Sequence, residues 1–83
     1  MSYKFQAPTQ DKTWLAQLHE WADFNKVRLE WQDATVRTGG IATLTSYPII
    51  QGRHYSQFSG EGSKQKISRG NAAEMIIRSP RVL

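Results

Sequence analysis

The sequence of 83 residues has no cysteine and no long run of apolar residues. The lack of cysteine excludes disulfides and thiolate metal sites, and it favours a reducing compartment. No segment has the apolar length needed to cross a bilayer, so we expect no membrane association. Residues 1–8 lack the apolar core of a secretory leader. We therefore expect a cytoplasmic protein, with the nucleus as an alternative.

Groups that support catalysis or metal binding are also scarce. No nucleophile–base pair or pair of carboxylates stands out, so we expect no enzymatic activity. His19 and His54 are the only histidines, which predicts neither a metal site nor a cofactor. Residues 60–66, GEGSKQK, lack the spacing of a nucleotide-binding P-loop. The three tryptophans lie at or beside apolar faces, which favours packing over stacking on single-stranded nucleic acid.

Acidic residues are scarce in the second half of the chain. Residues 1–33 contain four lysines or arginines and five acidic residues, whereas residues 34–83 contain seven and two. The net charge of +4 therefore comes from residues 34–83. An excess of this kind favours a polyanionic partner, although a small excess is also common on solvated surfaces.

The first helix is predicted over residues 14–25, where apolar residues recur every three to four positions. Asp11 and Thr13 precede it, and both are residue types that cap helix N-termini. A second face of this helix carries three polar residues at positions i, i+4 and i+7, namely Thr13, Gln17 and Glu20.

Three strands are predicted after this helix. Residues 27–32 alternate apolar and polar side chains, as a strand with one buried face does. Residues 33–40 indicate a loop or the end of a hairpin, and residues 41–50 are rich in β-branched residues. Pro48 predicts an edge position or a bulge in that second strand. A turn and a third strand over residues 54–60 follow.

The second helix is predicted from about Ser63 to Arg78, because small and apolar residues share one of its faces. The element order predicts an α+β fold, α-β-β-β-α, with two helices on one face of a three-stranded antiparallel sheet. The length allows one domain, which we place at residues 9–80, with a flexible N-terminal tail at residues 1–8 and a C-terminal tail at residues 81–83.

The most informative motif is GEGSKQKISRGNAA at residues 60–73. Gly60 and Gly62 are expected to adopt backbone angles that other residues avoid, which would turn the third strand sharply into the helix. Ser63 is the expected N-cap. Three side chains on the first turns are expected to project past the sheet beside the positive end of the helix dipole, and they are Gln65, Lys66 and Arg69. Phosphate groups suit such an arrangement.

This stretch resembles the C-terminal signature of the double-stranded RNA-binding domain, whose pattern is GxGxSKKxAKxxAA. Seven positions match or are conservatively replaced when the alanine pairs are aligned: Gly60, Gly62, Lys66, Ser68, Arg69, Ala72 and Ala73. Leu18-His19-Glu20 is similar to the family's first-helix signature, L-[NH]-E. The predicted element order is also that of the family, and the resemblance covers roughly residues 9–80.

The resemblance implies binding of duplex RNA by its shape, across two minor grooves and the major groove between them, with little sequence specificity. Carried over to this chain, Lys66 and Arg69 would contact major-groove phosphates, with Lys64 and Gln65 beside them. Glu20 would accept hydrogen bonds from 2′-hydroxyl groups in a minor groove, and Thr13 and Gln17 share its face.

Two departures from the family pattern leave an alternative open. Gln65 replaces the first motif lysine, for which Lys64 is the nearest substitute. The loop between the first two strands lacks the family's GPxH element, so Arg37 and Thr38 are the candidates for its minor-groove contact. On charge alone, Lys66 and Arg69 would be a solvated helix start. The alternative is a degenerate domain that acts as a protein-interaction or dimerisation module.

Overall fold

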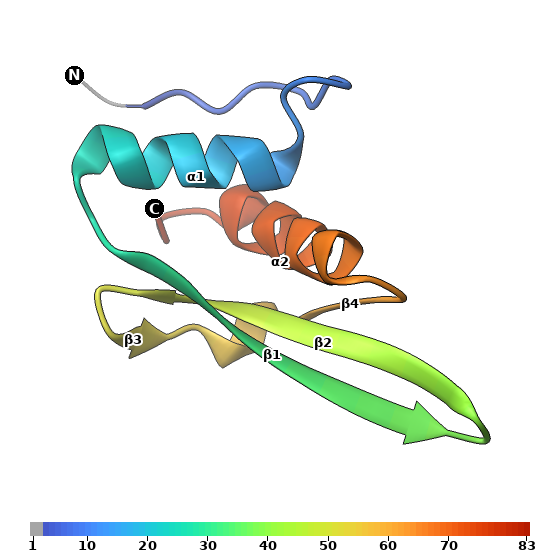
Figure 1. Ribbon diagram of the computed structural model, residues 1–83. Coiled ribbons are helices and arrows are strands. Elements are labelled where there is room, and N and C mark those ends of the chain that lie inside the picture. Colours follow the sequence, from blue (N-terminus) through green and yellow to red (C-terminus); the bar gives the residue numbers. More distant parts are fainter. Residues whose placement is uncertain (1–2) are drawn as a thin grey trace.

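The computed structural model describes residues 3–83, and it has two helices on one side of an antiparallel sheet (Figure 1). The elements are α1 (Trp14–Asn25), β1 (Leu29–Thr38), β2 (Ile41–Ile50), β3 (Arg53–His54), the short 3-10 helix η1 (Ser56–Phe58), β4 (Gly60–Gly62) and α2 (Gln65–Arg78). The strand order is β1-β2-β3, with β4 also paired to β2. The predicted α+β class and the order α-β-β-β-α are confirmed.

Helix α1 begins and ends where the sequence predicts. Thr13 is the N-cap, and its Oγ1 accepts a hydrogen bond from the Ala16 N–H at 3.1 Å. Lys26 ends the helix in the left-handed region with φ 55°, and its N–H reaches the carbonyls of Ala22 and Asp23. Of the two expected caps, Thr13 is therefore the one that forms.

The β1–β2 hairpin is longer than predicted. The strands pair without interruption from Leu29 opposite Ile50 to Thr38 opposite Ile41. Gly39 and Gly40, with φ of 57° and 81°, close a two-residue turn that fits the twist of paired strands. Of the two alternatives predicted for residues 33–40, the end of a hairpin is confirmed, and the loop is wrong for residues 33–38. Because residues 34–38 are exposed on both faces of the strand, their sequence lacks the alternation that marks a half-buried strand.

The third strand is interrupted, and Pro48 explains the position of the break. Pro48 lies inside β2 rather than at an edge, and its carbonyl accepts a hydrogen bond from the Tyr55 N–H at 3.0 Å. The N and C=O of one residue point to the same side of an antiparallel strand. The missing N–H of Pro48 therefore faces the chain between β3 and β4, which leaves the sheet there as η1.

Helix α2 approaches β4 so closely that no side chain fits between them. A Cβ atom on Gly60 would overlap the backbone N of Ala72 and the backbone O of Ser68. A Cβ atom on Gly62 would lie 2.8 Å from the backbone N of Ser68. Neither glycine has a positive φ, so the expected reason for these glycines, unusual backbone angles, is wrong. They are needed for the close approach of two backbones.

The core lies where α1 and α2 meet each other and β2. Its buried members are Leu18, Ile50, Ala73 and Ile76. Partly buried side chains surround it, among them Trp14, Trp21 and Trp31, so the tryptophans pack as predicted. Val82, in the C-terminal tail at residues 81–83, also packs against this core. None of the helices within residues 3–83 has the length and apolarity of a membrane span.

Candidate nucleic-acid interface

Three parts of the predicted interface lie toward the same end of the molecule: the starts of α1 and α2, and the Gly39–Gly40 turn (Figure 1). The strand pairing shows how far the Gly39–Gly40 turn projects, along the sheet, beyond the end of β4 that leads into α2. Gly62, at the end of β4, lies opposite Leu44, whereas the hairpin continues to Ile41. Three further residues at about 3.3 Å each carry the hairpin roughly 10 Å beyond the end of β4.

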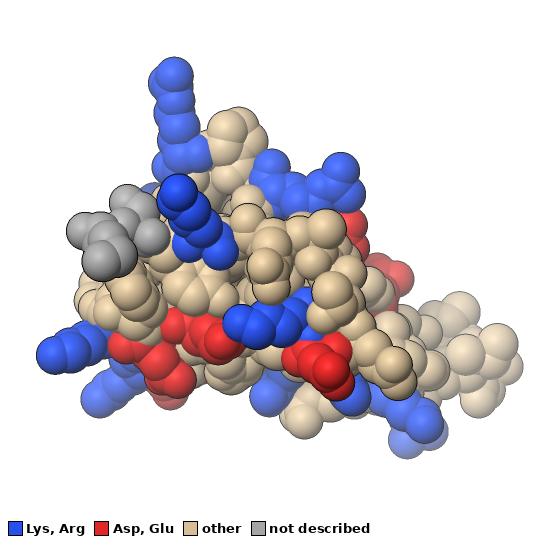
Figure 2. Space-filling view, turned by 90° about the horizontal axis from the view of Figure 1, so that it is seen from above, with Lys and Arg blue, Asp and Glu red and all other residues tan. Residues whose placement is uncertain are grey.

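The projecting end of the hairpin holds two predicted site residues, Arg37 and Thr38, and both are exposed. Val36 and Ile41 are exposed there as well, with 51% and 70% of their surfaces accessible. Seen from above α1, this end carries little charge, whereas acidic and basic side chains mix over the rest of that face (Figure 2). The hairpin thus offers a narrow, weakly charged projection rather than a basic one.

The start of α2 holds the free cations of the interface. Lys64 is the N-cap residue, with an extended backbone and no side-chain cap, so the expected Ser63 cap does not form. Lys64 and Lys66 are exposed. The ion pairs of residues 3–83 involve Lys12, Arg69 and Arg78, so neither of these two lysines has an acidic partner within that range. Both side chains are available to an anion.

Arg69 is not the free cation that its place in the motif suggests. Its Nη2 lies 2.6 Å from Asp33 Oδ2, and its Nε lies 3.2 Å from Asp33 Oδ1. The guanidinium also lies over the Trp31 ring, 5.5 Å from the centroid. Only 25% of the side chain is exposed. The expected projection of Arg69 toward phosphates is therefore corrected, because Asp33 on β1 occupies its donors. Gln65, although exposed, donates to Asp33 Oδ2 as well, at 3.2 Å.

Asp33 is the centre of a polar network that joins β1, β2 and α2. Its Oδ1 accepts a hydrogen bond from Ser46 at 2.5 Å, and the hydroxyls of Ser46 and Ser68, both buried, lie 2.7 Å apart. The hydrogen bond from Arg69 is the main reason why the pKa of Asp33 is lowered from its ordinary value of 3.8, although burial opposes this shift. Asp33 is therefore ionised at neutral pH and holds Arg69 in place.

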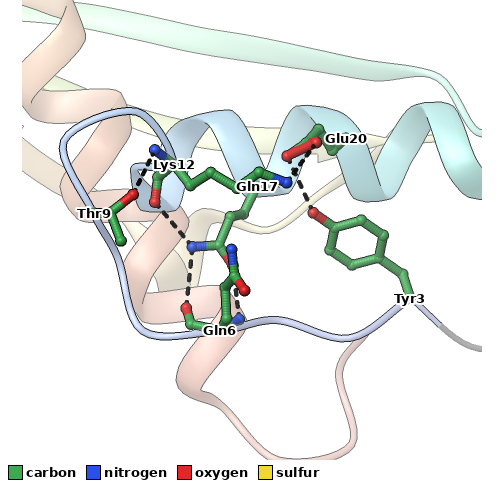
Figure 3. Close-up of polar contacts among 6 residues, drawn as sticks. All are labelled: Tyr3, Gln6, Thr9, Lys12, Gln17 and Glu20. Atoms are coloured by element: carbon green, nitrogen blue, oxygen red, sulfur yellow. Dashed lines mark hydrogen bonds and ion pairs between the residues drawn. The ribbon is translucent and has the colours of Figure 1, made fainter.

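The polar face of α1 is not open either. Gln17 is completely buried, because residues 3–9 lie across α1 and cover it (Figures 1 and 3). Gln17 Oε1 accepts from the Gln6 N–H at 2.9 Å, and Gln17 Nε2 donates to the carbonyls of Gln6 and Lys12 at 3.0 and 3.1 Å. Residues 3–8 of the predicted N-terminal tail therefore lie against α1, and residues 1–2 lie outside the described part.

The other two residues of that face are also engaged within the chain. Thr13 caps α1. The Glu20 carboxylate accepts hydrogen bonds from Tyr3 Oη and Lys12 Nζ, each at 3.3 Å (Figure 3). Glu20 itself remains exposed, so this carboxylate is accessible but already has two partners.

An apolar groove of about 370 Å³ lies between the starts of the two helices. Trp14 and Leu15 of α1 line one side, and Ile67 and Gly70 of α2 line the other. Its charged lining residues are Lys66 and Glu74. The groove thus begins beside one of the two free lysines.

Residues 3–83 contain no group of three or more side chains that could hold a metal ion.

Comparison of the chain with models of protein families gives no match, and comparison with curated proteins gives none either. The likeness to the double-stranded RNA-binding domain therefore rests on the quoted motif residues and on the order of the elements.

Proposed function

We propose that this domain binds duplex RNA through the end that carries Lys64, Lys66 and the Gly39–Gly40 turn. The observation that supports this most is the pair of exposed lysines at the N-terminus of α2, without acidic partners within residues 3–83. The helix dipole adds positive potential at the same place. Lysine ammonium groups and a helix N-terminus together suit backbone phosphates.

The projecting hairpin gives this site a second contact and a preference for A-form geometry. The minor groove of A-form RNA is wide and shallow and displays 2′-hydroxyls. A hairpin end with exposed Thr38, Arg37 and a glycine turn offers hydroxyl, guanidinium and backbone groups that pair with hydroxyls. Phosphates and 2′-hydroxyls carry no base identity, so the proposed binding has little sequence specificity. Such a module requires neither catalysis nor a cofactor.

Single substitutions of the free lysines test this function. Lys64→Ala and Lys66→Ala should each weaken binding of a 20-base-pair RNA duplex by about fivefold to tenfold at 0.1 M salt, because each loses one phosphate contact. Each should also make the slope of log K against log salt shallower by roughly one unit. Fluorescence anisotropy at several salt concentrations measures both quantities.

Arg28→Ala is the matched control. Arg28 is exposed, its side chain makes no hydrogen bond or ion pair within residues 3–83, and it precedes β1 at the opposite end of the sheet. The change removes one positive charge without touching the proposed interface, so affinity and slope should stay close to those of the wild type. Equal losses in Arg28→Ala and Lys66→Ala would mean that net charge alone attracts the RNA, which contradicts the proposed site.

A second candidate function, docking of a protein partner, is favoured by the apolar groove between α1 and α2. Ile67 lines it and is 45% exposed. Apolar docking depends little on salt, and it should persist in Lys64→Ala. The two functions are therefore distinguished by the same variants.

A further inference from the structure

Residues 3–9 form a strap along α1. The segment has no regular secondary structure and runs beside the helix on its outer side (Figures 1 and 3). Tyr3 packs edge-to-face on Phe5 and Phe24, with ring centroids 5.0 and 5.9 Å away. At the other end of the strap, Thr9 closes a turn with Lys12 through hydrogen bonds of 3.0 and 3.1 Å. The strap is therefore held at both ends and at Gln6.

The contact at Gln6 resembles the pairing of two strands. The side-chain amide of Gln17 both accepts from the Gln6 N–H and donates to the Gln6 carbonyl. A primary amide repeats the donor and acceptor of a peptide group, so it pairs with an extended chain in any sequence context. Because this pairing uses only the backbone of Gln6, the position of the strap depends on the chain path rather than on the Gln6 side chain.

The strap belongs to the least stable part of the molecule. Its residues from Gln6 to Thr9 are all exposed, and the buried core of Leu18, Ile50, Ala73 and Ile76 contains none of its side chains. Apart from the contact of Tyr3 with Phe24, a few hydrogen bonds hold the strap to the rest of the domain, each with a small net contribution. Segments of this kind open locally at a far lower free energy than the whole domain.

We propose that residues 3–9 are a displaceable strap that competes with duplex RNA for the outer face of α1. The proposal rests on the proposed function. The strap occupies the amide of Gln17 and shares the carboxylate of Glu20, two groups that pair with hydroxyls. Thr13 on the same face is the N-cap of α1, and α1 and α2 both begin toward the same end of the molecule (Figure 1). RNA that reaches along α1 must therefore lift the strap.

The closed strap lowers the apparent affinity by the fraction of molecules in which it is open. A variant that begins at Ala7 lacks Tyr3 and Gln6 and cannot close. If the strap of the full chain is open in about one-tenth of molecules, this variant should bind a 20-base-pair RNA duplex about tenfold more tightly.

The deletion also removes Lys4, and loss of a cation alone predicts weaker binding. Removal of the strap should thus raise the RNA affinity, whereas the loss of the Lys4 charge alone should lower it. N-terminal acetylation of both proteins keeps the terminal charge out of the comparison.

Gln6→Pro is the second variant, and it alters no charge. It removes the N–H that donates to Gln17 and should tighten RNA binding about threefold. Ala7→Pro is its matched control, because the Ala7 N–H makes no hydrogen bond within residues 3–83, and its affinity should match that of the wild type. If the shortened chain does not fold, these two full-length variants decide the question.

The outcomes separate the strap from the proposed function. Tighter binding in both the shortened chain and Gln6→Pro, but not in Ala7→Pro, supports the strap. If RNA binds the wild type and every variant with one affinity, or binds the shortened chain more weakly, the strap does not compete and the proposed function stands. If no form binds duplex RNA, both the proposed function and the role of the strap are rejected.

Discussion

Gly60→Ala is expected to lower the free energy of unfolding by at least about 3 kcal/mol, enough to unfold many domains of this size. The added methyl group would overlap the backbone of α2 at Ala72 and Ser68 and would lie 2.9 Å from the carbonyl carbon of Asn71. Backbone atoms cannot rotate away as a side chain does, so α2 would have to move off the sheet. Urea denaturation followed by circular dichroism measures the loss.

Gly70→Ala is the control for this prediction. Gly70 lies inside α2, and a methyl group there would meet no atom of another part of the described chain within 4 Å. Alanine favours a helix interior over glycine by about 0.5 to 1 kcal/mol, so this variant should be more stable than the wild type. Equal stability of Gly60→Ala and the wild type would show that α2 does not touch β4 as described.

Arg69→Ala is expected to destabilise the domain by about 2 kcal/mol. The change leaves the Asp33 carboxylate, 22% exposed, without its ion-pair partner, and it removes the guanidinium that lies over Trp31. Arg78→Ala is the matched control on the same helix. Its partner is Glu74, four residues away, and 69% of the Arg78 side chain is exposed, so the loss should stay below about 0.5 kcal/mol.

The effect of Arg69→Ala should depend on pH, with a sign set by Asp33. The pKa of Asp33 is lower in the folded protein than its ordinary value of 3.8. The stabilisation from this carboxylate is thus fully present above the unfolded pKa and is lost as the pH falls through the folded pKa. The stability difference between the wild type and Arg69→Ala should therefore narrow as the pH is lowered from about 5 toward 3. A difference that stays constant would contradict the role of Asp33.

The elements that the sequence predicts well are those with a local signal. Helix α1 has an apolar periodicity, Thr13 as its cap and a clear end, so its bounds follow from nearby residues. The break in the third strand has no such local signal, because its cause, the missing N–H of Pro48, lies in the neighbouring strand β2. The motif Gly60-x-Gly62 was correctly placed at a strand–helix junction. Its physical reason, contact between two backbones, depends on the packed structure.

The candidate site was harder to predict, because its residues are engaged by partners far away in the sequence. Asp33 lies 36 residues before Arg69, and no sequence pattern pairs them. Asp33 and Ser46 lie opposite each other in the hairpin, on the face toward α2. Two polar residues on a buried face would indicate a polar network, but the sequence does not show that these two are paired. The sequence puts Gln17 on the polar face of α1 but does not predict that the strap covers it, because the strap has no periodicity of its own.

The central claim is that this domain recognises A-form duplex RNA by shape, and titration with matched nucleic acids tests it most directly. A 20-base-pair RNA duplex, the DNA duplex of the same sequence and the single RNA strand are each titrated at two salt concentrations. We predict that the RNA duplex binds most tightly at both, because only it presents a wide minor groove lined with 2′-hydroxyls, and that a second RNA duplex of unrelated sequence binds equally well. Equal affinity for RNA and DNA duplexes, or tighter binding of the single strand, would contradict the account.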